Sequence, residues 1–294
     1  MESKDPKTVV NKPAAPAAAK PMTTAQKVQK EEKISNVKGI KNAFIVIILC
    51  AVAAVCIFLF GMGYSGNFEG GTTEGHPLNL AGTVYKGGFI VPILMTLLLT
   101  VITLSIERWI AISSAQGKGN TTKFVADIKG FLAKNEIDKA MARCKEQKGS
   151  VASVVYNTLV RYKEMDANTT LSKEQKLTTL RNEVEEATAL EMPSLSQNLP
   201  IIATLTTLGT LVGLLGTVMG MIKSFQALAN SGSPDSTELS TGISEALVNT
   251  AFGIATGAFA VISYNFFTNR IDNLTYAIDE IGFSIVATFA ATHK

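Results

Sequence analysis

Apolar residues are concentrated in four long runs, which polar segments separate. The runs cover residues 43–63, 89–106, 199–222 and 243–267. Each run is close to the ~20 residues that a helix needs to cross a bilayer, and the second is the shortest. The pattern therefore predicts an all-α, polytopic membrane protein. We place its four transmembrane helices at residues 43–63, 89–112, 199–222 and 241–267.

The segments between the runs complete the predicted organisation. Apolar residues recur at helical spacing within 113–198, and residues 135–138 are typical of a turn between two short helices. We expect a helical domain at 113–198 and a C-terminal helix at 268–294. Loops are expected at 64–88 and 223–240. Residues 1–42 are polar and proline-rich, so we expect a disordered basic tail there.

Lysine and arginine are distributed unevenly among these segments. Residues 1–42 hold nine lysines and residues 113–198 hold thirteen Lys and Arg, whereas the loops at 64–88 and 223–240 hold one lysine each. Basic residues accumulate on the cytoplasmic side of a membrane. The tail, the helical domain and the C-terminus are therefore predicted to be cytoplasmic. Those helical segments would form long cytoplasmic extensions of the membrane helices.

Glu245 lies near the start of the fourth apolar run, where Tyr264 is the only other ionisable side chain. Burying a carboxylate in hydrocarbon is costly, so such a residue is by default functional. No Lys or Arg lies inside any of the four apolar runs. We therefore expect its partner to be water, another chain or a proton. Desolvation favours the neutral carboxyl group, which favours a proton relay over a structural hydrogen bond.

Other polar residues share the predicted helix face of Glu245. At 100° per residue, Asn249 and Thr256 fall within about 40° of it, whereas Thr250 is about 140° away. In the third run, Thr210 and Thr217 overlap a stripe of small residues. We interpret Thr210, Asn249 and Thr256 as candidates for lining a lumen.

Glycines recur in the third run at steps of four, three and four residues. Such a stripe lets two helix backbones approach closely. The predicted packing stripe consists of Gly209, Gly213, Gly216 and Gly220.

Glu107 and Arg108 form a predicted ion pair at the end of the second span, followed by Trp109. Trp is enriched at membrane interfaces. An interfacial anchor and a contact between subunits both remain open for the pair.

The chain offers little for catalysis or for binding metals. Its histidines are His76 and His293, neither in a span, and its three cysteines have no metal-binding or redox spacing. We expect no enzyme activity, metal, cofactor or nucleic-acid partner. A secondary transporter is disfavoured because the spans show no internal repeat. A passive scaffold would leave Glu245 unexplained.

Two motifs carry a resemblance to a known family. They are Gly213-Leu-Leu-Gly-Thr-Val-Met-Gly-Met-Ile222 and Gly242-Ile-Ser-Glu-Ala-Leu-Val-Asn-Thr-Ala-Phe-Gly253. In this order, on either side of a short loop, they resemble the MotA/TolQ/ExbB proton channel family, and most of all its ExbB branch. The helix at 43–63 is additional to the shortest members. Thr210 and Phe259 stand where the family often has proline.

The resemblance implies a role for three residues and a set of partners. Glu245 matches the acidic residue of the family, and Thr217 and Thr250 match its two pore-lining threonines. The family forms a ring-shaped homopentamer in the bacterial inner membrane, around the single-span helix of an ExbD-like partner. An aspartate on that partner would carry the proton, and the proton motive force would drive a TonB-like transducer for outer-membrane import. A TolQ-like subunit, or a gliding or flagellar stator, is the alternative.

Overall fold

The computed structural model describes residues 39, 42–230 and 236–293. The predicted tail at 1–42 therefore lies outside the described residues, except for Gly39 and Asn42. The described residues belong to one compact unit, Ile34–Lys294. They form helices and contain no strand, and Phe68 and Pro77 make an isolated antiparallel bridge. The described part of the chain is thus all-α, as predicted.

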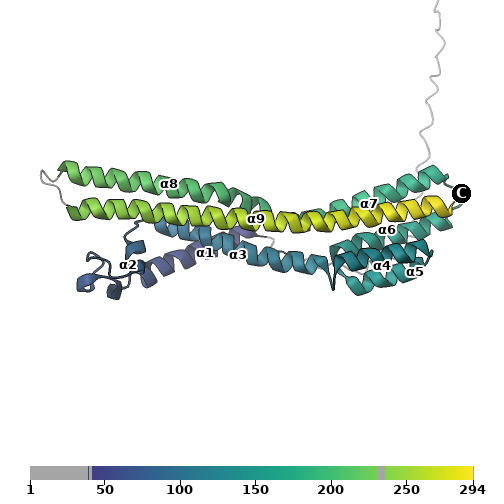
Figure 1. Ribbon diagram of the computed structural model, residues 1–294, viewed down its shortest axis with the longest axis horizontal. Helices are drawn as coiled ribbons and strands as arrows, with labels where there is room; N and C mark the ends of the chain where they lie inside the picture. The colour runs from purple at the N-terminus through teal and green to yellow at the C-terminus, as the bar shows by residue number, and fades with distance from the viewer. Residues whose placement is uncertain (1–38, 40–41, 231–235, 294) are drawn as a thin grey trace, which may run out of the picture. The chain divides into compact units, whose positions relative to one another are not determined.

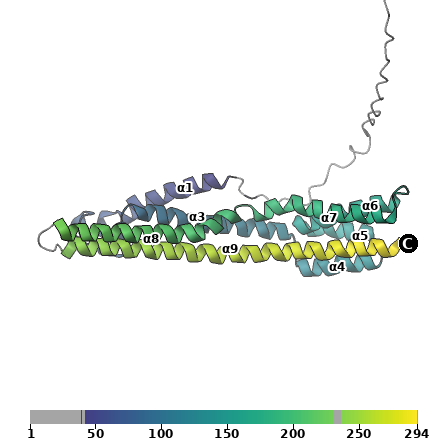
Figure 2. The same ribbon diagram turned by 90° about the horizontal axis from the view of Figure 1, so that it is seen from above.

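Among the described residues, four helices are long and apolar enough to cross a membrane. They are α1 (Ala43–Cys56, continued by a π-helical turn at Ile57–Met62), α3 (Ile90–Gln116), α8 (Leu199–Asn230) and α9 (Ser236–Thr292). Each contains most of one apolar run. Figures 1 and 2 show α8 lying beside α9, and α3 lying between α1 and α9. This is the arrangement of a multi-pass membrane protein.

The last two helices are longer than predicted. Helix α8 continues beyond residue 222 to Asn230, and α9 begins at Ser236, so much of the expected loop at 223–240 is helical. Helix α9 also continues without a break past residue 267. The reason is that buried residues recur at helical spacing beyond that point: Ile271, Leu274, Ile278, Ile281 and Ile285. The membrane helix and the predicted C-terminal helix are one element.

The segment at 113–198 forms a helical domain around the second half of α9 (Figure 1). It contains α4 (Thr121–Ala133), α5 (Ile137–Gln147), α6 (Gly149–Ala167) and α7 (Lys173–Ser196). Asn135 has a φ of 57° in the turn between α4 and α5, where the sequence predicts a turn. Apolar side chains from all of these helices and α9 share one core.

The segment between α1 and α3 closes the opposite end of the unit. It contains the short helix α2 (Leu80–Tyr85) and the Phe68–Pro77 bridge, so it is hairpin-like. Tyr85 stacks on Phe58 with a ring-centroid distance of 4.8 Å. A small second core lies beneath, formed by Ala54, Phe58, Val84, Val91 and Met95. This core fixes the start of α3 against α1.

Cys144 provides a test of the helical domain. Burial raises the pKa of its thiol to about 12, and the nearby Arg143 offsets only part of that effect. Because the thiolate is the reactive form, we expect Cys144 to resist a water-soluble maleimide at pH 8.5 in the native protein. A Cys50→Ser/Cys56→Ser variant isolates this thiol for mass spectrometry. Labelling should become fast in denaturant, and equally fast labelling of the native protein would contradict the buried position.

Candidate functional site

The glycine stripe of α8 lies directly against α9. A Cβ atom built on Gly213 would lie 2.8 Å from the Cα of Gly253, and one built on Gly220 would lie 2.8 Å from the backbone nitrogen of Ala246. Gly209 and Gly216 are equally crowded, by Thr256 and Asn249. We call this contact the α8–α9 seam. None of these four positions can accept a side chain unless an atom of α9 shifts.

Glu245 is buried beside one end of the seam. Only 6% of its side chain is exposed, and both carboxylate oxygens accept hydrogen bonds from Lys223 Nζ, at 2.8 and 2.9 Å. The backbone of Gly88 covers the carboxylate, since a Cβ atom built there would lie 2.2 Å from Glu245 Oε1. Gly88 has a φ of 79°, which favours glycine. The carboxylate is thus held between a lysine and a glycine.

Lys223 is the functional residue that the sequence reasoning missed. We expected no basic partner because no apolar run contains Lys or Arg, and Lys223 was assigned to the loop. That expectation is wrong, because α8 extends past residue 222 and carries Lys223 alongside the first turns of α9. The available signal was its position as the first charged residue after the third apolar run.

Asn249 and Thr256 are fully buried. Asn249 Nδ2 donates to the Gly87 carbonyl at 3.2 Å, and Thr256 Oγ1 donates to the Phe252 carbonyl at 2.8 Å. These two side chains therefore face the interior of a single chain and not a lumen. Their shared helix face with Glu245 follows from the sequence, but the sequence does not show that α8 covers that face. Thr210, the third lumen candidate, is exposed.

Thr217 and Thr250 meet across the seam through their hydroxyl groups. Both hydroxyls also lie near the Ala246 carbonyl, at 3.4 Å for Thr217 and 3.2 Å for Thr250. Among the described hydrogen bonds, none joins either threonine to Glu245. The Glu245 side chain points to another side of α9, toward Lys223. The structure thus brings the two threonines together and links them to Glu245 through the intervening turn of helix.

Glu107 and Arg108 form a buried pair at the junction of three helices. Arg108 is fully buried and donates to the Glu107 carboxylate. It also donates to the carbonyls of Ser194 and Leu195, each at 3.3 Å, while Asn198 Nδ2 donates to Glu107 at 3.3 Å. The pair therefore ties α3 to the α7–α8 junction within one chain, which neither earlier interpretation anticipated. Trp109, its neighbour, is exposed and stacks on Phe266.

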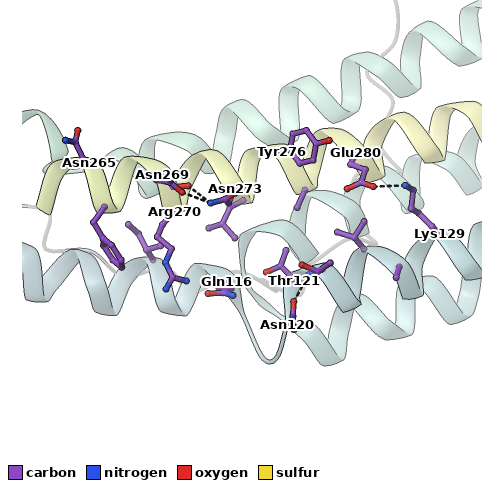
Figure 3. Close-up of a pocket in the computed structure, with 17 residues that line it drawn as sticks. Gln116, Asn120, Thr121, Lys129, Asn265, Asn269, Arg270, Asn273, Tyr276 and Glu280 are labelled. Atoms are coloured by element: carbon purple, nitrogen blue, oxygen red, sulfur yellow. Dashed lines mark hydrogen bonds and ion pairs between the residues drawn. The ribbon is translucent and has the colours of Figure 1, made fainter. Parts of the chain in front are cut away.

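A cavity of about 890 Å³ lies between α3, α4 and α9. Figure 3 shows polar side chains along it, among them Asn269, Asn273 and Arg270, and an ion pair between Lys129 and Glu280 at 2.7 Å. It contains neither Glu245 nor the threonine pair. In the described ranges, no group of three or more His, Cys, Asp or Glu residues could hold a metal ion.

These features define a class of protein. It is a multi-pass, all-α membrane protein that buries a carboxylate–lysine pair and two contacting threonines between its last two long helices. Comparison with known proteins agrees with this class. Residues 146–280 match the MotA/TolQ/ExbB proton channel family. The chain therefore carries a domain of this family, which includes Thr217, Lys223, Glu245 and Thr250.

Individual relatives have two different names. The chain is 35% identical to the Tol-Pal system protein TolQ of Pseudomonas aeruginosa over 88 residues, which cover 30% of this chain and 38% of that protein. It is 26% identical to the biopolymer transport protein ExbB of Pseudomonas putida over 196 residues, which cover 67% of this chain and 59% of that protein. The aligned part thus spans between about two fifths and three fifths of these relatives. The matches do not separate ExbB from TolQ.

Replacing Gly213 with alanine tests the seam. The added methyl group would meet the backbone of Gly253, which cannot move aside as a flexible side chain would. We expect a loss of about 1–3 kcal/mol, the usual cost of overpacking, measured as a lower unfolding temperature in detergent. Gly130→Ala in α4 is the matched control, because nothing lies within 4 Å of that position. Equal behaviour of the two variants would contradict the close contact.

Replacing Gly88 with alanine tests the position of the carboxylate. The variant adds left-handed backbone strain of about 1–2 kcal/mol and a clash with Glu245 Oε1. Gly70→Ala isolates the strain, because Gly70 has a φ of 77° and nothing within 4 Å. We expect Gly88→Ala to lower the unfolding temperature more than Gly70→Ala does. If the two losses are the same, Gly88 does not confine the carboxylate.

Proposed function

We propose that this chain is the proton-channel stator subunit of an ExbB–ExbD-type motor in the bacterial inner membrane. The motor would use the proton motive force to energise TonB-dependent import across the outer membrane. The observation that carries the proposal is the buried carboxylate of Glu245 at the α8–α9 seam. A buried ionisable group in a membrane helix is expensive and marks ion pathways and proton relays.

The chemistry of the surrounding groups suits proton transfer. A carboxylate can accept a proton and release it, and hydroxyl groups can both donate and accept hydrogen bonds. Thr217 and Thr250 supply two such hydroxyls in direct contact. Each proton that crosses the membrane would release about 2.3 kcal/mol per 100 mV. A side chain can take part in this proton flow only if it binds and releases a proton. The carboxyl group of Glu245 has this chemistry.

The proposed assembly is a homopentamer in the lipid membrane around an ExbD-like single-span partner. Large apolar side chains on the outer faces of α8 and α9 are exposed in the single chain, among them Leu211, Leu215, Ile254 and Ile262. Lipid or neighbouring subunits would cover these side chains. The basic segments 1–42 and 113–198 support cytoplasmic termini, with the helical domain on the cytoplasmic side. We propose neither enzyme activity nor binding of cofactors or nucleic acid.

A TolQ-like role in envelope maintenance is the second candidate function. The 35% identity to TolQ over 88 residues favours it. Gliding or flagellar stators would use the same chemistry, but the relatives described above are named TolQ and ExbB. The two leading roles differ in the process that is energised and not in the proton site.

Replacing Glu245 with glutamine tests the proton-driven role. Glutamine keeps the size of the side chain but cannot exchange a proton, so we expect growth on limiting iron or haem to fail. Blue-native gels should still show the oligomer. Asp279→Asn removes an exposed carboxylate from the same helix and serves as the control.

The same strains separate the two candidate roles. Loss of growth with intact resistance to detergent supports the ExbB-like role, and the reverse supports the TolQ-like role. Normal growth and normal detergent resistance of Glu245→Gln would exclude both. If the oligomer is absent, Glu245→Asp, which keeps the acid, shows whether assembly or proton exchange was lost.

A further inference from the structure

The Lys223–Glu245 pair is exposed at one end only. About half of the Lys223 side chain is exposed (49%), whereas Glu245 is almost completely covered (6%). The ammonium group bonds both carboxylate oxygens at nearly equal distances, 2.8 and 2.9 Å. A molecule or ion that approaches this site from outside the chain therefore meets Lys223 before it meets Glu245.

Backbone of the segment before α3 covers the carboxylate, and the backbones of α8 and α9 are in contact beside Glu245. The seam glycines Gly220 and Gly242 bring α8 and α9 into contact next to Glu245, since a Cβ atom built on Gly220 would lie 2.8 Å from the Gly242 carbonyl oxygen. Gly88 covers the carboxylate from the segment before α3. Helices and backbone cannot withdraw easily, but a lysine side chain has a flexible four-carbon stem. Lys223 is the movable part of the enclosure.

We propose that Lys223 is the internal counter-ion and gate of Glu245. It keeps the carboxylate ionised while bonded, and it must swing outward before Glu245 can take a proton. The role of Lys223 as a gate rests on the proposed function, but its contact with Glu245 can be tested without any transport assay.

Loss of Lys223 leaves a buried carboxylate with no compensating charge, and such a group is neutralised by taking up a proton. The protonation of Glu245 in a Lys223 variant therefore tests whether Lys223 is its counter-ion.

Dicyclohexylcarbodiimide reports this protonation directly. The protonated carboxyl group adds across a C=N bond of the reagent to form an O-acylisourea, which rearranges to a stable N-acylurea without a further reactant. In the wild-type protein at pH 7, we expect little labelling of Glu245. In Lys223→Met we expect the labelling rate to rise on the order of tenfold, the change in neutral fraction that loss of one charge-assisted pair produces.

Two controls define the result. Lys86→Met removes a lysine of the neighbouring segment, whose ammonium group bonds the Glu74 carbonyl and not Glu245, so its labelling should match the wild type. Glu245→Gln should abolish the labelled peptide. An unchanged labelling rate in folded Lys223→Met, or fast labelling of the wild type, overturns the proposal.

The wild-type protein supplies an independent test if Lys223→Met does not fold. A water-soluble carbodiimide at mildly acidic pH activates a carboxyl group, and a neighbouring amine then attacks it, releasing the urea and forming an amide. We expect a zero-length cross-link between the Lys223 and Glu245 peptides in the purified complex. Its absence overturns the contact. The labelling results can also agree with the proposal while the Glu245→Gln variant still energises import normally. In that case Lys223 remains the counter-ion of Glu245, and the proposed function is refuted.

Discussion

The close contact between α8 and α9 is the interaction on which the rest of the site depends. Membrane helices gain little from hydrophobic burial against each other, because lipid is as apolar as their side chains. Van der Waals packing must hold them, and glycine permits it by bringing backbones together. Here the stripe from Gly209 to Gly220 meets Gly253, Ala246, Asn249 and Thr256 on α9. This contact determines which polar groups face each other.

The seam divides the polar groups of α9 into two sets. Glu245 faces Lys223 and Gly88, while Thr250 faces Thr217 on another side of the same helix. The two sets are joined through the turn that contains Ala246, whose carbonyl accepts from both threonines. Under the proposed function, a proton that passes from Glu245 to the hydroxyls would therefore have to travel around α9. Water or a group from a second chain has to bridge this step.

Local periodicity explains what the sequence predicts well. The four apolar runs, the packing stripe and the turn before α5 depend only on residues close in sequence, and the structure contains all of them. Contacts between distant segments are different. A helical wheel groups Asn249 and Thr256 with Glu245 but does not show that α8 covers them. The closing of Gly88 over a carboxylate more than 150 positions away depends on the packing of α3 against α9.

The continuity of α9 links Glu245 to the helical domain. One helix runs from Ser236 to Thr292, a length of roughly 85 Å at 1.5 Å per residue. Glu245 lies near its start, and the core shared with α4, α6 and α7 surrounds its second half. The buried Arg108 fixes α3 to the α7–α8 junction, between these two regions. A movement of α9 at Glu245 cannot be absorbed by a hinge at residue 267, because the helix has none there. A rigid-body movement of α9 would therefore be transmitted to the helical domain.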